Sequence, residues 1–357
     1  MSTLKKILII AGGTGGHIFP ALAVADELQK QGVIVEWMGT TFGMEKKLVG
    51  NRYPIHYLRV KTFRENNLVE KCLLPVRLLS AVFSAYRIIK KINPDVVLGM
   101  GGYASGPGGI TAWLARKKLV IHEQNAHAGF TNRVLSRFAS VTLEAFPDSF
   151  SKNTKVITVG NPVRAAIQKI AHPKAYFANR EMPWRILVLG GSQGAHFINQ
   201  LLMDFVSANT NRQAFLLWHQ TGAKEYEKVK AAYAQYEAFP HRVAPFIEKM
   251  DEAYAWADIV IGRAGALTVS EIAVVGLPSI LIPYPYATDD HQYKNALFLQ
   301  KNKAAFIFRQ QDLTVEKLTA CLQNNFFSQK QLQMLSTNAK RSAVADATAN
   351  IIRSLSA

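Results

Sequence analysis

Lys6-Ile-Leu-Ile-Ile-Ala11 runs directly into Gly12-Gly-Thr-Gly-Gly-His17, and this junction carries the clearest signal of the fold class. A short apolar run that ends in a glycine-rich turn is typical of a buried strand leading into a helix. A helical pattern of apolar residues does follow, from Phe19 to Lys30. Strand, glycine-rich turn and helix together form the opening unit of a doubly wound α/β domain.

The second half of the chain repeats this order. Arg185-Ile-Leu-Val-Leu189 runs into Gly190-Gly-Ser-Gln-Gly194, and a helical pattern follows from Ala195 to Val206. Continuous apolar runs indicate further strands in both halves, as expected where helices cover both faces of a parallel sheet. These runs are Val33–Gly39, Val96–Met100, Leu119–His122, Ala214–Gln220, Asp258–Gly262 and Ser279–Pro283.

The length of the chain also favours two domains, because 357 residues exceed the usual size of a single core. Gly160-Asn-Pro162 interrupts the pattern between the two repeats and is the predicted hinge. We therefore predict an α/β protein with two Rossmann-like doubly wound domains that face one cleft, residues 1–162 and 163–340. A last helical pattern runs from Leu332 to Leu355, and we expect residues 341–357 to pack back on the first domain.

The chain is strongly basic, with 42 Lys and Arg against 25 Asp and Glu and a formal net charge of +17. Residues 1–163 hold +11 of this excess and residues 164–357 hold +6. A basic half indicates an anionic partner, either nucleic acid, acidic lipid or a phosphorylated substrate. The sequence contains no RNA-binding signature and no helix-turn-helix pattern, so we predict no nucleic-acid partner.

Cysteine usage and hydropathy exclude other classes of protein. Cys72 and Cys321 are far apart and lie in no metal-binding spacing, which argues against a disulfide framework or a zinc site. No apolar run reaches the roughly 20 residues of a membrane-spanning helix, and the run near the N-terminus is too short for a secretory signal. We expect a soluble or peripheral protein.

Three glycine-rich loops, Gly12–His17, Gly101–Gly109 and Gly190–Gly194, are candidates for anion binding. Glycine lets backbone N–H groups approach a phosphate at a helix N-terminus. The first and last loops do not match GxGxxG, and the chain has no GxxxxGK[ST]. Glu36 lies near the end of the second strand, where a dinucleotide enzyme has its ribose-binding acid, so an NAD-dependent oxidoreductase remains an alternative.

A further constellation, Arg263-Ala-Gly-Ala-Leu-Thr-Val-Ser-Glu271, follows a predicted strand and should open a helix. We expect Gly265 to permit the turn and the N–H groups of Ala266–Thr268 to meet phosphate or sugar oxygens. Glu271 could accept hydrogen bonds from both ribose hydroxyls, or could act only as a residue of the helix N-terminus. The pattern favours a nucleotide-sugar ligand.

Six motifs resemble, in order and spacing, those of the MurG family, and the resemblance covers nearly the whole chain. They are Gly12–His17, His122-Glu-Gln-Asn125, Gly160-Asn-Pro-Val-Arg164, Gly190–Gly194, Arg263–Glu271 and His291-Gln-Tyr-Lys-Asn-Ala296. The family transfers GlcNAc from UDP-GlcNAc to the undecaprenyl-diphosphate-linked acceptor lipid I, which forms lipid II in peptidoglycan synthesis. The resemblance implies the two-domain GT-B glycosyltransferase fold. A UDP-sugar epimerase or glycolipid synthase of the same fold is the nearest enzyme alternative.

The resemblance also implies a donor site. Thr14, Gly15 and Gly16 belong to it, with Asn125 and Arg164 beside the cleft and Ser192 at the diphosphate. Ile247 would meet the uracil through its backbone, and Gln292 the GlcNAc hydroxyls. Phosphate, sugar and ribose would be covered by Ala266, Leu267, Thr268, Val269, Ser270 and Glu271. Tyr284–Asp290, just before Gln292, departs more from the family pattern than the other segments.

The implied reaction inverts the anomeric carbon as an acceptor hydroxyl attacks and UDP leaves. It needs a base, for which His17 is the first candidate and Glu123 the alternative. The chain has no Asp-x-Asp metal motif, so we predict no metal and no cofactor. Helix N-termini and Arg164 would stabilise the leaving diphosphate instead.

The segment Leu68–Lys91 has apolar residues at helical spacing, interleaved with Lys71, Arg77, Arg87, Lys90 and Lys91. It could bury Leu74, Leu78 and Phe83 in an anionic membrane, or pack its apolar side on its own sheet. Trp113 and Arg116–Lys118 could extend the basic patch. With a lipid acceptor, we predict a peripheral protein on the cytoplasmic face of the bacterial inner membrane.

Overall fold

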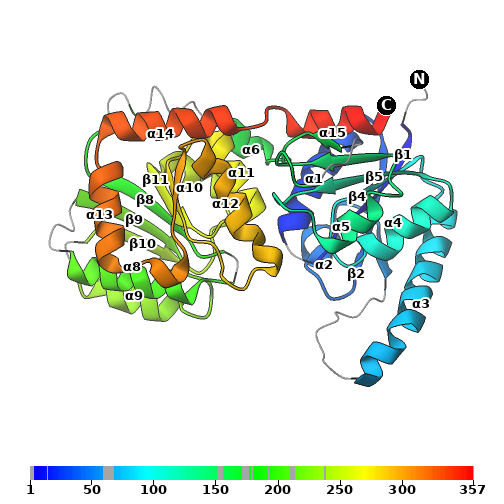
Figure 1. Ribbon diagram of the computed structural model, residues 1–357, viewed down its shortest axis with the longest axis horizontal. Coiled ribbons are helices and arrows are strands. Elements are labelled where there is room, and N and C mark those ends of the chain that lie inside the picture. Colours follow the sequence, from blue (N-terminus) through cyan, green and yellow to red (C-terminus); the bar gives the residue numbers. More distant parts are fainter. Residues whose placement is uncertain are drawn as a thin grey trace. The chain divides into compact units, whose positions relative to one another are not determined.

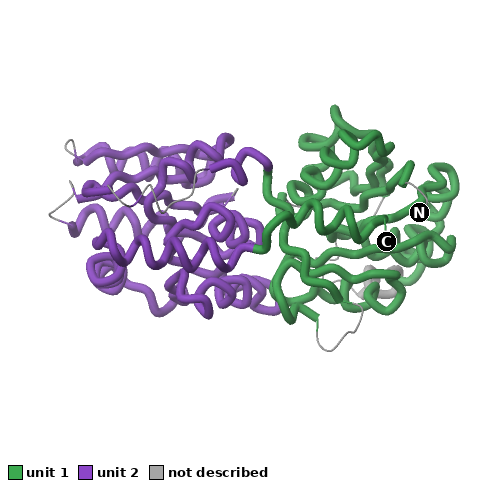
Figure 2. Tube along the Cα trace, turned by 90° about the horizontal axis from the view of Figure 1, so that it is seen from above, with its two compact units in different colours: residues 1–164, 344–357 green, residues 165–343 purple. Residues whose placement is uncertain are grey.

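The structure is a computed structural model that describes residues 4–13, 15–58, 68–150, 156–170, 177, 180–191, 193–209, 214–236 and 239–356. For residues 68–74 it describes the backbone only. The chain divides into two compact units (Figure 2). Unit 1 comprises Met1–Arg164 and Val344–Ala357, and unit 2 comprises Ala165–Ala343.

Unit 1 is built on a parallel sheet of seven strands in the order β3-β2-β1-β4-β5-β6-β7 (Figure 1). The strands are β1 (Lys6–Ile10), β2 (Ile34–Thr40), β3 (Ile55–Leu58), β4 (Val96–Gly99), β5 (Lys118–Glu123), β6 (Val141–Glu144) and β7 (Val156–Thr158). Its helices are α1 (Gly15–Lys30), α2 (Glu45–Leu48), α3 (Leu68–Ile92), α4 (Ser105–Leu114), α5 (Phe130–Leu135) and α15 (Ala347–Ser356).

The central strand β1 shows why this unit is apolar on both faces of its sheet. Ile7 and Ile9 pack with α1 and α15, whereas Leu8 and Ile10 pack with α3 and α4. Successive side chains of a strand point to opposite faces, so a strand covered on both sides must be apolar throughout.

Unit 2 has a parallel sheet of six strands in the order β10-β9-β8-β11-β12-β13. The strands are β8 (Trp184–Leu189), β9 (Phe215–Gln220), β10 (His241–Ala244), β11 (Ile259–Gly262), β12 (Ser279–Leu281) and β13 (Ala305–Ile307). The helices are α6 (Ala165–Gln168), α8 (His196–Ala208), α9 (Tyr226–Ala234), α10 (Met250–Trp256), α11 (Ala266–Val275), α12 (His291–Lys301), α13 (Val315–Asn325) and α14 (Gln329–Ser342), with short 3₁₀ turns at Thr288–Asp290 and Gln310–Asp312.

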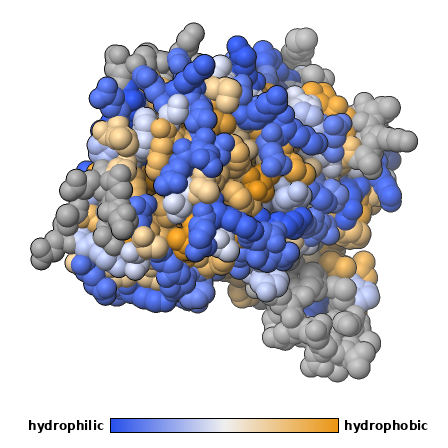
Figure 3. Space-filling view, turned by 60° about the vertical axis from the view of Figure 1, so that its left-hand side comes forward, coloured by the Kyte–Doolittle hydropathy of each residue, from blue (hydrophilic) through white to orange (hydrophobic). Residues whose placement is uncertain are grey.

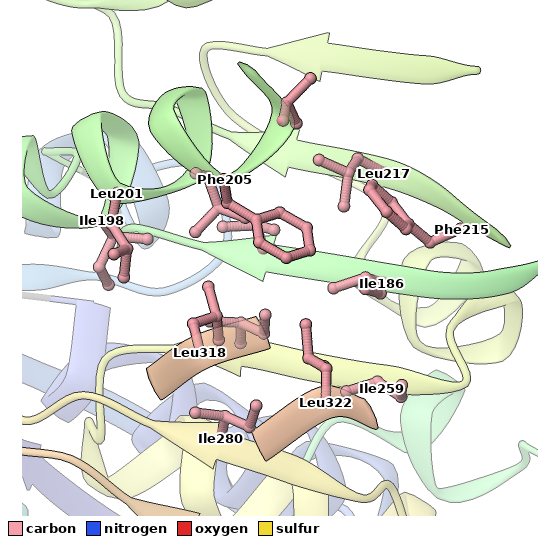
Figure 4. Packing of buried hydrophobic residues seen from close by; sticks show 14 of the residues in the cluster. Ile186, Ile198, Leu201, Phe205, Phe215, Leu217, Ile259, Ile280, Leu318 and Leu322 are labelled. Atoms are coloured by element: carbon pink, nitrogen blue, oxygen red, sulfur yellow. The ribbon is translucent and has the colours of Figure 1, made fainter. Parts of the chain in front are cut away.

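One core of unit 2 lies between its sheet and helices α8 and α13. Phe205 of α8 and Leu318 of α13 point toward Ile186 at the centre of the sheet (Figure 4). Buried apolar surface of this kind contributes about 25 cal/mol per Å². The face of the molecule drawn in Figure 3 carries hydrophilic residues interspersed with smaller apolar areas.

The predicted α/β class with two Rossmann-like sheets is therefore confirmed, whereas two predicted element bounds are wrong. The first helix begins at Gly15 rather than Phe19, which places the end of the glycine loop in its first turn. The last helical pattern is not continuous: α14 ends at Ser342 and α15 begins at Ala347, with Asp346 at a φ of 54° between them. Helix α15 packs on α1.

Each sheet reverses its strand order once, between β1 and β4 in unit 1 and between β8 and β11 in unit 2. In open parallel sheets, ligands bind outside the carboxyl ends of the strands at this reversal. The glycine loops after β1 and β8 and the turn after β11 all lie at these places.

Candidate functional site

In unit 1, His17 lies in the first turn of α1, beside the turn that follows β4. Gly101 is in the left-handed region at a φ of 95°, and a Cβ there would lie 2.6 Å from Cδ2 of His17. Glycine is therefore required at residue 101 both by the backbone and by the imidazole. Gly15 and Gly16 precede His17 in the same turn, where helical N–H groups have no intrahelical acceptor. Thr14 lies outside the described residues.

The N–H of Gly13 points to a protein carboxylate. Oε1 of the fully buried Glu45 accepts hydrogen bonds from Gly13 N at 3.2 Å, Thr40 N at 2.9 Å and Thr40 Oγ1 at 3.0 Å. Gly43 also packs closely against this carboxylate, since a Cβ at Gly43 would overlap the oxygens of Glu45. Glu45 thus ties the first glycine loop to the end of β2. In this structure Gly13 N–H serves that bond rather than an anion.

The third glycine-rich stretch, Gly101–Gly109, was predicted to be an anion loop and is only partly a loop. Helix α4 begins at Ser105. A Cβ at Gly108 would lie 2.5 Å from Ile10, and one at Gly109 would lie 2.8 Å from Leu135. These two glycines allow α4 to pack closely on its neighbours and have no place in an anion loop.

Glu123 ends β5 and is 3% exposed. Its Oε1 accepts from Asn125 N at 2.9 Å and Asn125 Nδ2 at 3.1 Å. Its Oε2 accepts from Asn132 Nδ2 at 2.8 Å and Gly129 N at 3.2 Å. Four donors on one carboxylate are the pattern of a group that holds a loop. The arrangement places Asn125 and favours the organising role over that of the base.

His122 precedes Glu123 and faces the predicted hinge. Its Nε2 donates to the carbonyl of Gly160 at 2.9 Å, and burial lowers its pKa to about 4. The imidazole is therefore neutral at pH 7. Asn161 Nδ2 donates to Gln124 O at 3.0 Å, so the C-terminal end of β5 and the residue after it are joined twice to residues 160–161. At the end of this stretch the guanidinium of Arg164 lies over the ring of Phe19, 5.4 Å from its centroid.

In unit 2, the loop after β8 is turned by Gly191 and Gly194, whose φ angles are 83° and 81°. A Cβ at Gly194 would lie 2.2 Å from the carbonyl oxygen of Thr221, so this loop packs directly on the residues after β9. Asn199 of α8 supports the same contact, because its Nδ2 donates to Thr221 O at 3.0 Å. Ser192 lies outside the described residues.

Helix α11 begins as predicted after β11, with Gly265 as its N-cap. The first helical bond runs from Val269 N to Gly265 O, so the N–H groups of Ala266, Leu267 and Thr268 occupy the free first turn. Gly265 lies in the predicted turn with φ −64° and ψ 143°, a conformation that is open to any residue. A Cβ at Gly265 would touch only Thr268 Oγ1, at 3.7 Å.

Glu271 lies in the second turn of α11 and is 4% exposed. Its Oε2 accepts a hydrogen bond from the phenol of Tyr254 in α10 at 3.0 Å. Ser270 Oγ donates back to Ala266 O at 2.9 Å, and Val269 is fully buried. Of the predicted run 266–271, the first three residues thus offer backbone N–H groups and Glu271 offers the carboxylate, while Val269 packs in the interior.

The two remaining predicted residues, Ile247 and Gln292, lie toward opposite edges of the sheet of unit 2. Ile247 follows β10, is buried, and donates its N–H to Oε1 of Gln220 at 2.9 Å. Gln292 lies in the first turn of α12, and its Oε1 accepts from Tyr284 N at 3.0 Å. Arg263 holds the same segment, because its guanidinium donates to Ile282 O and Pro283 O, both at 3.1 Å. Burial lowers the pKa of Arg263 to about 10, so it stays charged at pH 7.

The predicted residues thus fall into one set in each unit. His17, Glu123, Asn125 and Arg164 belong to unit 1, and Ile247, Ala266–Glu271 and Gln292 to unit 2. Sequence reasoning missed Glu45, Gln220, Asn199 and Tyr254. Gln220 carried a usable signal, a polar residue that ends a buried strand, whereas Glu45 and Tyr254 acquire their partners only through folding.

Metal binding and membrane spanning each require a recognisable arrangement of residues. The described residues contain no group of three or more His, Cys, Asp or Glu arranged to hold a metal ion. Within the same part of the chain, no helix is both long enough and apolar enough to cross a membrane.

Comparison with known proteins matches both halves of the chain. The N-terminal domain of glycosyltransferase family 28 matches residues 7–143, and the C-terminal domain of that family matches residues 185–351. The chain is 48% identical over 349 residues to a protein of Coxiella burnetii named UDP-N-acetylglucosamine--N-acetylmuramyl-(pentapeptide) pyrophosphoryl-undecaprenol N-acetylglucosamine transferase. The match covers 98% of this chain and 97% of that relative. A relative of the same name from Shewanella oneidensis is 46% identical over 97% of this chain and 96% of its own.

Solved structures agree. The crystal structure of Acinetobacter baumannii MurG is similar at a TM-score of 0.85 and 38% identity, over 99% of each chain. A UDP-N-acetylglucosamine 2-epimerase from Listeria monocytogenes has a TM-score of 0.69 at 14% identity, over 99% of this chain and 95% of that one. At that identity the likeness shows the fold alone.

Proposed function

The chain belongs to glycosyltransferase family 28 and within it to the MurG enzymes, and from this premise we propose how its residues serve the reaction. The protein transfers N-acetylglucosamine from UDP-GlcNAc to N-acetylmuramyl-(pentapeptide) pyrophosphoryl-undecaprenol, that is, it converts lipid I to lipid II. The observation that carries this function is the 48% identity over 98% of the chain to a relative of that name. The fold is GT-B.

The alternative functions lose support. The acid expected of a dinucleotide enzyme, Glu36, is engaged by His56 Nε2 at 2.8 Å. The epimerases resemble the chain in fold only.

Unit 2 holds the donor in this proposal. The N–H groups of Ala266–Thr268 form the N-terminus of α11, where a helix favours negative charge. Glu271 accepts hydrogen bonds from the ribose hydroxyls, oriented by Tyr254. Ile247 meets the uracil through its backbone, Ser192 contacts the diphosphate, and Gln292 contacts the GlcNAc hydroxyls.

Unit 1 holds the acceptor and the base. His17 takes the proton of the acceptor hydroxyl as the bond from that oxygen to the anomeric carbon forms and the bond to UDP breaks. Imidazole is the side chain that most often serves as a general base in enzymes. Gly101 leaves room for the ring, and Glu123 positions Asn125. Backbone N–H groups and positive charge in unit 1 also face the diphosphate. They come from Thr14, Gly15, Gly16 and Arg164.

The leaving diphosphate is stabilised by groups that are fixed before the reaction. Helix N-termini and a guanidinium need little reorganisation as charge develops, which is the most effective form of electrostatic catalysis. On this account the reaction needs no metal.

A surface of helices α3 and α4 is the proposed membrane contact. Val76, Leu79 and Phe83 lie on one side of α3, exposed to 63%, 69% and 64%. The opposite side, with Ala81, Ala85 and Ile89, packs in the core. The apolar residues of α3 whose side chains are described therefore divide between the core and the exposed side of the helix, and the exposed ones support the proposed contact.

Exposed basic residues adjoin this apolar side at one end. They are Arg87, Lys90 and Lys91, near the end of α3. Trp113 and Leu114 of α4 are about half exposed. Apolar side chains next to Lys and Arg are suited to the surface of an anionic bilayer. The side chains of Lys71 and Leu74 lie outside the described ones. A lipid-linked acceptor and this surface support a peripheral position on the cytoplasmic face of the inner membrane.

The test of the function is direct transfer. Purified protein, UDP-[14C]GlcNAc and a lipid I analogue should yield labelled disaccharide-lipid product, and NADH should not bind. Hydrolysis or epimerisation of UDP-GlcNAc without transfer to the lipid would overturn the proposed function.

A further inference from the structure

Gln220 is the last residue of β9, the strand between β8 and β10 in the sheet of unit 2. The strand register pairs it with Leu189 of β8 on one side and with Ala244 of β10 on the other. Gly190–Gly194 begins directly after Leu189, and the segment that leads to Ile247 begins directly after Ala244. Gln220 therefore sits between the proposed diphosphate loop and the proposed uracil segment.

The side-chain amide of Gln220 joins these two segments. It is 5% exposed. Its Nε2 donates to the carbonyl of Gly191 at 2.9 Å, and its Oε1 accepts from the N–H of Ile247 at 2.9 Å. A primary amide carries a donor and an acceptor on adjacent atoms, so one side chain can satisfy a carbonyl and an N–H at once. The backbone carbonyl of Gln220 adds a third contact, accepting from Gly190 N at 3.2 Å.

The bonds fall on residues that a donor molecule would contact or adjoin. The N–H of Ile247 donates to Gln220 and is occupied, and this bond orients the peptide backbone there. The carbonyl of Ile247 is the acceptor that this residue offers to the imide N–H of uracil. Gly191 has a φ of 83°. Its carbonyl accepts hydrogen bonds from Gly194 N at 3.1 Å and from Nε2 of Gln220, so the amide of Gln220 is one of two bonds that orient this peptide group.

We propose that Gln220 is a positioning residue for the nucleoside diphosphate of the donor, acting through Gly191 on the diphosphate side and through Ile247 on the base side. This inference rests on the proposed function, because it takes those two segments as the donor site. A uridine diphosphate must reach both segments at once, so the amide sets their separation to fit that ligand. The two ends of the amide have different effects. Oε1 accepts from Ile247 and so orients the segment that recognises the base, whereas Nε2 donates to Gly191 and so orients the diphosphate loop.

Two substitutions separate the ends. Gln220→Glu has nearly the same shape and keeps an oxygen for Ile247 N–H, but places a second oxygen against the carbonyl of Gly191. Gln220→Leu removes both bonds. The matched control is Gln329→Leu, since Gln329 also donates its Nε2 to a backbone carbonyl of unit 2, that of Phe177 at 2.7 Å. Gln329 opens α14 and has no part in the proposed donor site.

The experiment measures UDP and CDP affinities by calorimetry on the full chain, with thermal melts of every variant. Cytosine lacks the imide N–H, so the ratio of UDP affinity to CDP affinity measures how strongly the protein selects uracil over cytosine. Gln220→Glu should bind both nucleotides about tenfold to a hundredfold more weakly and keep the wild-type ratio. Gln220→Leu should lose as much affinity for UDP, and its preference for UDP over CDP should also fall by about tenfold. Gln329→Leu should keep both affinities, even if it melts earlier.

The outcomes distinguish this inference from the function on which it rests. A wild-type protein that binds neither UDP nor UDP-GlcNAc would overturn the proposed function. A wild-type protein that prefers UDP, with both Gln220 variants equal to it in affinity and ratio, would overturn only the role of Gln220. That role is also overturned if a folded Gln220→Leu protein loses affinity but keeps the full UDP preference, because Ile247 would then be placed without the amide. If Gln220→Leu does not fold, an unchanged UDP affinity in Gln220→Glu overturns the inference.

Discussion

The phenol of Tyr254 donates a hydrogen bond to Oε2 of Glu271 at 3.0 Å, from helix α10 to helix α11 of unit 2. Both side chains are buried. A carboxylate held in this way keeps one orientation, which is what recognition of two neighbouring hydroxyls requires. Because the two side chains are bonded, a substitution of either Glu271 or Tyr254 tests whether Glu271 binds the ribose hydroxyls.

Glu271→Ala should weaken UDP-GlcNAc binding by about 1–3 kcal/mol, the usual cost of losing charge-assisted hydrogen bonds. Tyr254→Phe should cost about 1 kcal/mol, because Glu271 stays but loses one orienting bond. Tyr233→Phe is the control, since its hydroxyl contacts the buried His219 in the same unit. Calorimetry that finds unchanged affinity in folded Glu271→Ala protein would remove Glu271 from the site.

His17→Asn should lower kcat by about 10²- to 10⁴-fold, the typical contribution of a general base. The Kd for UDP-GlcNAc should stay the same, because the proposed donor residues that bind uracil, ribose and GlcNAc are in unit 2. Steady-state transfer assays with saturating UDP-GlcNAc measure kcat, and calorimetry measures the Kd. Full turnover in the His17→Asn enzyme would assign the base to another residue.

Glu123→Gln separates an organising carboxylate from a catalytic one. The variant leaves at least one of the four donors on Glu123 without an acceptor, so unit 1 should lose about 1–3 kcal/mol of stability. Thermal melts and kcat should therefore fall together. A variant with the wild-type melting temperature and a kcat reduced a thousandfold would instead make Glu123 the base.

Stability should fall in mild acid because of two buried imidazoles. Burial lowers the pKa of His122 to about 4 and that of His219 to about 3. Below about pH 6.5 the unfolded chain binds protons at these two histidines, whereas the folded chain does not. Proton binding therefore stabilises the unfolded state and lowers the free energy of unfolding. At pH 5 each should cost about 2 kcal/mol relative to pH 7.5. Melting curves between these pH values should be less pH-dependent for His219→Gln than for wild type; parallel curves would contradict the assignment.

Membrane binding should depend on the exposed side of α3. Replacing both Leu79 and Phe83 by Ser should remove about 3–6 kcal/mol of apolar insertion, and should reduce sedimentation with phosphatidylglycerol vesicles and turnover of the lipid acceptor. The matched control is Ile34→Ser with Ile157→Ser, two residues of unit 1 exposed to 55% and 49% on strands of its sheet. UDP-GlcNAc affinity should not change in either protein. Equal sedimentation of the two double variants would rule out α3 as the contact.

Much of the fold was accessible to sequence reasoning because its signals are local. An apolar run of β1 followed by a glycine turn reports a buried strand and a helix start without any knowledge of neighbours. Short strands were missed for the same reason. β3, β7 and β13 have only three or four residues, and their mixed burial leaves no period to detect.

The site was accessible only in part. Motif positions such as His17, Glu123 and Glu271 could be named, because each follows a strand or opens a helix. Their hydrogen-bond partners could not, since Asn132 for Glu123 and Tyr254 for Glu271 are chosen by how separate helices pack. The turn at Gly265 could be predicted, but its backbone conformation could not, because a glycine in a sequence does not reveal its φ.

Residue types at short spacing were enough to establish the α/β class, the duplicated strand, glycine loop and helix, and the family. The folded chain set the features that depend on non-local contacts. It placed Glu45 on the loop at Gly13, joined Gly191 to Ile247 through Gln220, and returned α15 to α1. The physical reason is that a parallel sheet aligns the carboxyl ends of strands that are distant in sequence. Which polar side chains meet there depends on register, and register is a property of the folded sheet.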